Sequence, residues 1–248
     1  MAVIETSGLT KRYGETAAVE ELDLTVEGGT IYGFLGPNGA GKTTTMRLLT
    51  GLTRPTEGSA TVAGVDVQER DRLGERIGYA PDEPPLYEQL TAREQLAAVA
   101  DVRGIDPEEK RERIPALLDR FDLDAADDRI ETYSKGMKQK TSVIQAILHR
   151  PAVVFLDEPT GGLDPNAART MKELLVELRA EGTTVFLSTH VLPVVEELAD
   201  TVGLLYDGRL LAEDDPGALQ RRLAGDSLED AFVELTTEGA ATDAAGRR

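Results

Sequence analysis

Residues 36–43 read Gly36-Pro37-Asn38-Gly39-Ala40-Gly41-Lys42-Thr43, a complete G-x-x-x-x-G-K-T motif that Thr44 follows. The apolar segment before it, residues 30–35, predicts a strand, and residues 42–49 predict a helix. The glycines let the loop curl so that successive backbone N–H groups face one anion, and the helix N-terminus adds a partial positive charge. Lys42 can reach the outer phosphates of a nucleotide, and the Thr43 hydroxyl is a hard oxygen ligand for Mg²⁺. The stretch therefore predicts a phosphate-binding loop rather than an ordinary glycine-rich turn.

Two carboxylates end a second apolar segment. Residues 153–156 are Val-Val-Phe-Leu, and Asp157 and Glu158 follow directly. Parallel strands of α/β proteins bind ligands at their carboxyl ends, so we expect this pair at the same edge as the phosphate loop. There Asp157 would hold Mg²⁺ through its hydration shell, and Glu158 would polarise the water that attacks the phosphate. An apolar run that ends in acids can also be only a strand meeting solvent, but the phosphate loop favours the catalytic interpretation.

The chain has two histidines. His190 follows the apolar segment 183–188, which predicts a strand, so His190 is also expected at the carboxyl edge of the sheet, within reach of a γ-phosphate. A structural or merely exposed histidine is the alternative. His149 lies at the end of a predicted helix just before Pro151, where a favourable interaction with the helix C-terminus is explanation enough.

The order of the predicted segments indicates an α/β fold. Short apolar segments alternate with helical ones, and such strands are typical of a mainly parallel sheet that is buried on both faces. Residues 4–9, 17–26 and 59–65 predict a small antiparallel β subdomain at the edge. Residues 89–150 contain no convincing strand and predict an inserted α-helical subdomain. Helix starts are predicted at Thr91 with Glu94, at Asp106, at Asp164 and at Ser227. Gly182 is predicted to end the helix that begins at Asp164.

Composition limits the kinds of function. The 248 residues carry a formal net charge of −18, so neither a nucleic acid nor an anionic lipid surface is expected as the main ligand. The absence of cysteine excludes disulfides, thiolate zinc sites and cysteine nucleophiles, and it fits a reducing cytoplasm. No signal peptide or membrane-spanning run is recognisable, so we expect any link to a membrane to go through a partner. A halophilic source and an acidic surface that merely aids solubility explain the charge about equally.

Taken together, the motifs resemble the ATP-binding cassette (ABC) family of P-loop NTPases in their usual order. The phosphate loop is followed by Tyr133-Ser134-Lys135-Gly136-Met137-Lys138-Gln139, by Asp157-Glu158, by Gly162-Leu163-Asp164 and by His190. The resemblance implies a RecA-like core within a single ABC ATPase domain over residues 1–235. That domain would have its core in residues 1–88 and 151–225, its helical subdomain in residues 89–150, and a flexible tail after it in residues 236–248.

Several roles follow from the resemblance alone. Ser134, Gly136 and the helix N-terminus beside them would cap the γ-phosphate of ATP held by the other subunit of a dimer. Tyr13 would stack on adenine, although packing at a sheet edge is an alternative for this tyrosine. Asp82 stands where the family usually has a glutamine that contacts Mg²⁺ and the attacking water, and Lys135 stands where it usually has a glycine. Aspartate is still a hard oxygen ligand, but a shorter and charged one.

The resemblance also implies a mechanism. Two copies of the chain would form a homodimer around two Mg-ATP, and closure and reopening of the dimer would power a separate transmembrane permease. The chain would then be cytoplasmic and peripheral on the inner face of the cell membrane. The residues implied are Glu158, His190 and Asp82 for catalysis, and Thr43, Asp157 and Asp82 for the metal.

The branch of the family and the rival functions depend on a few residues. Lys135, Asp82 and residues 227–235 are similar to the export branch that includes multidrug, sodium-extrusion and cytochrome-maturation ATPases, which favours an exporter. One alternative is a soluble ABC-type ATPase that acts on ribosomes or DNA, and another is a nucleotide-gated regulator that is not coupled to transport. A P-loop kinase would leave Ser134 and His190 unexplained.

Overall fold

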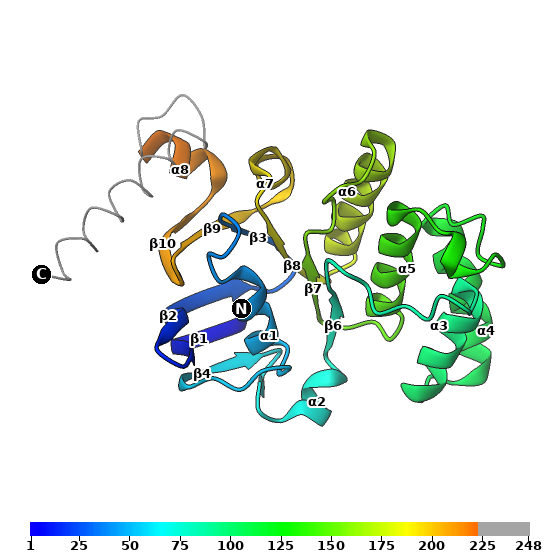
Figure 1. Ribbon diagram of the computed structural model, residues 1–248, viewed down its shortest axis with the longest axis horizontal. Helices are drawn as coiled ribbons and strands as arrows, with labels where there is room; N and C mark the ends of the chain where they lie inside the picture. The colour runs from blue at the N-terminus through cyan, green and yellow to red at the C-terminus, as the bar shows by residue number, and fades with distance from the viewer. Residues whose placement is uncertain (223–248) are drawn as a thin grey trace, which may run out of the picture.

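The computed structural model describes residues 1–222 of the chain. The helix start predicted at Ser227, the export-like segment 227–235, the last residues of the predicted core and the tail 236–248 lie outside these residues. The described part consists of two β-sheets and the helices around them (Figure 1).

A six-stranded sheet forms the centre of the fold, in the order β10-β9-β3-β8-β7-β6. Neighbouring strands are parallel except for β9 and β10, so the predicted α/β fold with a mainly parallel sheet is confirmed. The carboxyl ends of β3, β6, β7 and β8 therefore meet at one edge. The strands are β3 (Ile31–Leu35), β6 (Ile77–Ala80), β7 (Val153–Asp157), β8 (Thr184–Thr189), β9 (Thr201–Tyr206) and β10 (Arg209–Asp214).

The apolar runs form central strands because both faces of this sheet are covered. In β3, Ile31 and Leu35 pack into one cluster of buried side chains, and Tyr32 and Phe34 pack into another. In the second cluster Phe186 stacks on Tyr32, with ring centroids 5.1 Å apart. A strand with one solvated face would alternate apolar and polar residues, so the continuous apolar pattern reflects burial on both sides.

The second sheet is antiparallel and has four strands in the order β2-β1-β4-β5. Its buried side chains share one cluster with α1 (Lys42–Leu49) and with one face of the central sheet. The predicted antiparallel β subdomain is therefore confirmed, and it covers the sheet beside the phosphate loop. The strands are β1 (Ala2–Tyr13), β2 (Thr16–Glu27), β4 (Glu57–Val62) and β5 (Val65–Asp66), and the short helix α2 (Arg70–Gly74) follows them.

Between β6 and β7 the named elements are helical. They are α3 (Ala92–Val102), α4 (Pro107–Arg120), the 3₁₀ turn η1 (Ile130–Thr132) and α5 (Lys135–Ile147). These helices stand together at one side of the central sheet in Figure 1. Thr91 and Glu94 form the predicted capping box of α3, and Asp106 and Ser134 cap the helices α4 and α5. The inserted helices thus lie where the sequence predicts them.

The last third of the described chain adds three helices, α6 (Pro165–Ala180), α7 (Leu192–Leu198) and α8 (Pro216–Arg222). Asp164 caps α6 as predicted, and Gly182, with a φ of 92°, follows its end. Across residues 1–222, every helix is too short or too polar to cross a lipid bilayer.

His149 does not act as predicted. Its Nε2 atom lies 2.9 Å from the carbonyl oxygen of Ile77 in β6 and 3.2 Å from Nη1 of Arg103. Burial, together with the Arg103 charge, lowers the pKa of His149 to about 4. A neutral imidazole gains nothing from the helix dipole, so the predicted interaction with the helix C-terminus is wrong. His149 instead joins the end of α5 to the start of β6.

Candidate functional site

The phosphate loop leaves β3 and enters α1 at the carboxyl edge of the central sheet. Gly41, the N-cap of α1, has a φ of 107°, which L side chains rarely adopt. A Cβ atom at this position would lie 2.3 Å from the carbonyl oxygen of Ala18 in β2. Only glycine therefore fits here, and Ala18 forms one wall of the loop. Sequence reasoning missed Ala18, because nothing in a strand of the other sheet marks it.

The Lys42 side chain is buried between the carbonyl oxygens of the phosphate loop and the Glu158 carboxylate. Its Nζ atom donates to the carbonyl oxygens of Gly36, at 2.7 Å, and Pro37, at 3.3 Å. The same atom lies 3.7 Å from Oε1 of Glu158. Burial lowers the pKa of Lys42, and the Glu158 and Asp157 carboxylates oppose that shift. The ammonium group is thus fixed between the loop and the two carboxylates that end β7.

Asp157 connects the loop to the strand ends. The Thr43 hydroxyl donates to Oδ2 of Asp157 at 2.9 Å, and the Ser188 hydroxyl donates to Oδ1. Ser188 is the direct neighbour of Asp157 in the parallel pair β7 and β8. Sequence reasoning missed Ser188, although its position one strand away at the same edge was the signal that could have identified it.

Glu158 is held by residues that follow the adjacent strand. Oε1 lies 2.8 Å from Nδ1 of His190, and the Thr189 hydroxyl donates to Oε2 at 3.1 Å. The backbone of Glu158 has a φ of 50°, a conformation that is uncommon for residues other than glycine and that ends the strand direction of β7 abruptly. Both carboxylate oxygens are therefore oriented by β8 and the turn after it. After Ala18 and Ser188, Thr189 is the third residue that the sequence did not single out.

Lys42, Asp157 and Glu158 line one cavity of about 240 Å³. Asp82, which follows β6, faces it as well, so three carboxylates and one ammonium group line the cavity. His190 stands beside it through its bond to Glu158. The complete lining is Ala18, Pro37, Asn38, Gly39, Gly41, Lys42, Thr43, Thr44, Asp82, Asp157 and Glu158.

Other residues named from the sequence lie outside this lining. Gly36 and Ala40 belong to the phosphate loop, while Tyr13, Ser134 and Gly136 belong to other segments and do not line the cavity. Tyr13 is half exposed at the end of β1, and Lys11 Nζ lies 5.2 Å from its ring centroid. Ser134 is exposed and accepts a hydrogen bond from the N–H of Met137, at 3.2 Å.

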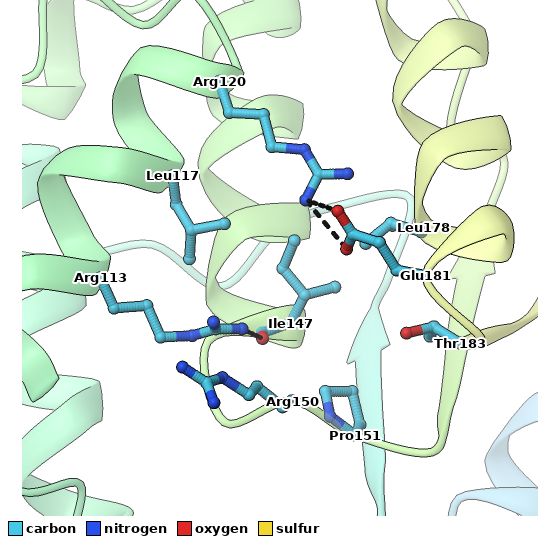
Figure 2. A pocket seen from close by; sticks show the side chains of 9 residues that line it. All are labelled: Arg113, Leu117, Arg120, Ile147, Arg150, Pro151, Leu178, Glu181 and Thr183. Atoms are coloured by element: carbon cyan, nitrogen blue, oxygen red, sulfur yellow. Dashed lines mark hydrogen bonds and ion pairs between the residues drawn. The ribbon is translucent and has the colours of Figure 1, made fainter.

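A second cavity, about 350 Å³ in volume, lies among α4, α5 and α6 (Figure 2). Its three arginines are all engaged by the protein. Arg113 donates to the last carbonyl groups of α5, at 2.6 and 2.9 Å. Arg120 pairs with Glu181 and a second glutamate near the end of α6, at 3.1 Å, and Arg150 pairs with a glutamate of α4, at 3.2 Å. This cavity lies in the contact between α4, α5 and α6, here called the helix seam, where the three arginines connect the helices.

The comparison with known proteins decides the family. The family model described as ABC transporter matches residues 19–161, more than half of the chain. The chain belongs to the ABC transporter family. The daunorubicin/doxorubicin resistance ATP-binding protein DrrA of Streptomyces peucetius is 42% identical to this ABC protein over 227 residues, 91% of this chain and 69% of the relative.

Solved ABC structures agree with this assignment. The structure of the ATP-binding subunit of an ABC transporter has a TM-score of 0.87 at 33% identity, covering 94% of this chain and 99% of that chain. A dimeric ATP-binding cassette in a post-hydrolysis state, bound to ADP and Pi, has a TM-score of 0.78 at 25% identity, covering 86% and 98%. The predicted family, fold and ATPase activity are confirmed, and ATP is the nucleotide of this ABC protein.

Proposed function

We propose that this ABC ATPase is the ATP-hydrolysing subunit of an exporter and that it works as a homodimer whose two copies close head to tail around two Mg-ATP. The observation that carries the proposal is the convergence of Lys42, Asp157 and Glu158 on one cavity, with His190 bonded to Glu158. Charged groups of both signs at the carboxyl edge of a parallel sheet, beside a phosphate loop, are the parts that phosphoryl transfer needs.

The oxygen atoms at the cavity fit Mg²⁺. The Thr43 hydroxyl and the Asp157 carboxylate lie 2.9 Å apart, and the Asp82 carboxylate faces the same space. Mg²⁺ is usually held by one or two carboxylates together with phosphate oxygens, and these side-chain oxygens match that preference. When bound, the ion would neutralise charge on the phosphoryl group that is transferred.

Glu158 is placed to act on the attacking water, because His190 and Thr189 fix both of its carboxylate oxygens. It orients the water in line with the bond between the γ-phosphorus and the β–γ bridging oxygen. As the water oxygen bonds to phosphorus, its proton passes to Glu158 and the bridging oxygen leaves with ADP. Lys42 supplies positive charge to the phosphate oxygens during this step.

The position of Ser134 supports the dimer. Ser134 is exposed at the N-terminus of α5, and neither it nor Gly136 lines the cavity of its own chain. A helix N-terminus is a good phosphate site, so the exposed Ser134 is available to the γ-phosphate held by a second copy, while Gly136 is buried in the first turn of the same helix. Tyr13 is exposed and so available for stacking on adenine.

The export role and its setting rest on the relatives and on the charged residues. The resemblance to a drug-resistance protein supports export, and Asp82 and Lys135 support the same branch. Motion of the dimer would pass through residues 82–90 and the helices of residues 89–150 to a separate transmembrane permease, with this chain on the inner face of the cell membrane. The proposed organisation is a single ABC ATPase domain over residues 1–235, and the net charge of −18 supports a halophilic source.

The test is ATPase activity of the purified chain with Glu158→Gln, at low and at multimolar KCl, with light scattering to follow dimerisation. We expect turnover to fall by roughly 10²–10⁴-fold while ATP binding persists and ATP stabilises a dimer. Glu112→Gln, the same change at an exposed position of α4, is the matched control and should keep wild-type turnover. Wild-type chain that binds ATP without turnover at any salt concentration would favour the nucleotide-gated regulator, and full activity in Glu158→Gln would remove this residue from the mechanism.

A further inference from the structure

The nucleotide cavity carries more negative charge than phosphate binding favours. Asp82, Asp157 and Glu158 face it with only Lys42 as a cation in its lining. Asp157 is bonded to Thr43, and Glu158 is bonded to His190, so both have partners within the site. Asp82 has none among the residues of the lining. A third carboxylate at this position repels a triphosphate unless another group compensates its charge.

Lys135, the first residue of α5, lies next to this carboxylate. Its Nζ atom is 3.6 Å from Oδ1 of Asp82, and the two side chains are 52% and 49% exposed. The outer part of the Lys135 side chain lies against Gly162. The site of a Cβ atom at Gly162 would be 3.0 Å from Nζ and 3.4 Å from Cδ of Lys135. The lysine can lie there because Gly162 has no side chain, so its ammonium group is directed toward Asp82.

Helix stability does not account for Lys135. A cation in the first turn opposes the helix dipole, and α5 has no acidic residue in that turn to offset it. Lys135 therefore destabilises α5, and an interaction of its charge with a group outside the helix is needed to offset this cost. Within residues 1–222, the carboxylate that pairs with Lys135 is that of Asp82.

We propose that Lys135 is a positioning residue for the nucleotide site, where it neutralises Asp82 so that this carboxylate can serve the Mg-nucleotide without repelling the phosphates. The inference rests on the proposed function only in taking ATP as the occupant of the cavity. Asp82 and Lys135 then act as one neutral unit that crosses from the segment after β6 to the first turn of α5. The same turn begins at Ser134, so the unit also links the nucleotide cavity to the proposed dimer contact.

A neighbouring ion pair provides a matched control. Lys138 of α5 lies 2.7 Å from Glu88, so it joins the same helix to the same segment, but Glu88 does not line the cavity. If Lys135 only fastens α5 to the segment 82–90, neutralising Lys138 should have the same effect as neutralising Lys135. If Lys135 compensates charge at the nucleotide, only its own removal should change nucleotide affinity.

The experiment measures the Kd of the full chain for ATP by titration calorimetry, once with Mg²⁺ and once with EDTA, which removes any contribution of Asp82 as a metal ligand. We expect Lys135→Met to weaken binding by about two- to fivefold in low salt, the range of a single exposed ion pair, and 1 M KCl to reduce the difference. With EDTA, the double variant Asp82→Asn/Lys135→Met should return to the wild-type Kd. Lys138→Met should bind ATP as wild type does.

The remaining outcomes separate a failure of this inference from a failure of the proposed function. Wild-type affinity in Lys135→Met, equal weakening in Lys138→Met, or no recovery in the double variant with EDTA would overturn the inference. Wild-type chain that does not bind ATP at all would instead overturn the proposed function. A melting temperature for each variant shows whether the chain is folded, and the recovery in the double variant distinguishes charge compensation from misfolding.

Discussion

Replacing Gly78 with alanine tests how closely α5 lies on the central sheet. A Cβ atom on Gly78 of β6 would lie 2.0 Å from the carbonyl oxygen of Ala146 and 2.8 Å from its carbon. Because these are backbone atoms of α5, no side-chain rotation relieves the clash, and the end of the helix must move by about 1.5 Å to reach ordinary contact. Overpacking of this kind costs about 1–3 kcal/mol, which lowers the melting temperature by about 2–4 °C per kcal/mol in a chain of this size.

Urea denaturation measures this cost directly. Gly74→Ala is the matched control, because Gly74 ends α2 and nothing lies within 4 Å of its Cβ position. The control should leave stability unchanged or raise it by up to about 1 kcal/mol, since alanine loses less backbone entropy than glycine. We also expect Gly78→Ala to lower ATPase activity at temperatures where it stays folded, because α5 carries Ser134 and Lys135. A Gly78→Ala chain as stable as wild type would refute the close contact between β6 and α5.

Three further predictions concern protonation, the helix seam and salt. His149 is neutral when folded, with a pKa of about 4 against an ordinary value of 6.5. As the pH falls, His149 therefore takes up a proton in the unfolded chain before it does so in the folded chain. The free energy of unfolding should stay constant above pH 6.5 and fall by about 1–2 kcal/mol toward pH 4, after allowance for partial solvent exposure. Urea midpoints at pH 7 and pH 5 should differ less in His149→Gln than in wild type. Arg120→Met removes the pairing of α4 with two glutamates near the end of α6 and should cost about 1 kcal/mol, so an unchanged melting temperature would contradict that role of the seam. The net charge of −18 predicts a rising melting temperature as the Debye length shortens from about 10 Å in 0.1 M KCl to about 3 Å in 1 M, and a chain equally stable in both would count against a halophilic source.

Much of the candidate site could be predicted because its parts are local. The phosphate loop needs only residues that are adjacent in sequence, and the end of β7 places Asp157 and Glu158 side by side. Caps such as Ser134 on α5 are local as well, because the donor lies three residues along the chain. In each case the backbone geometry between the residues is set by one turn, strand end or helix start.

The sequence by itself determined the α/β class, the strands that are buried on both faces, the antiparallel β subdomain, the helical insertion and the residue types of the phosphate loop. Only the tertiary structure decided that Ser188 and Thr189 hold the two carboxylates, that His149 is neutral against β6, and that Asp82 pairs with Lys135, 53 positions further along the chain. Hydrophobic periodicity and local hydrogen bonding act within one element and can be recognised along the sequence. The order of strands in a sheet and the distance between packed helices join elements that are far apart in the chain, and they determine which polar groups meet.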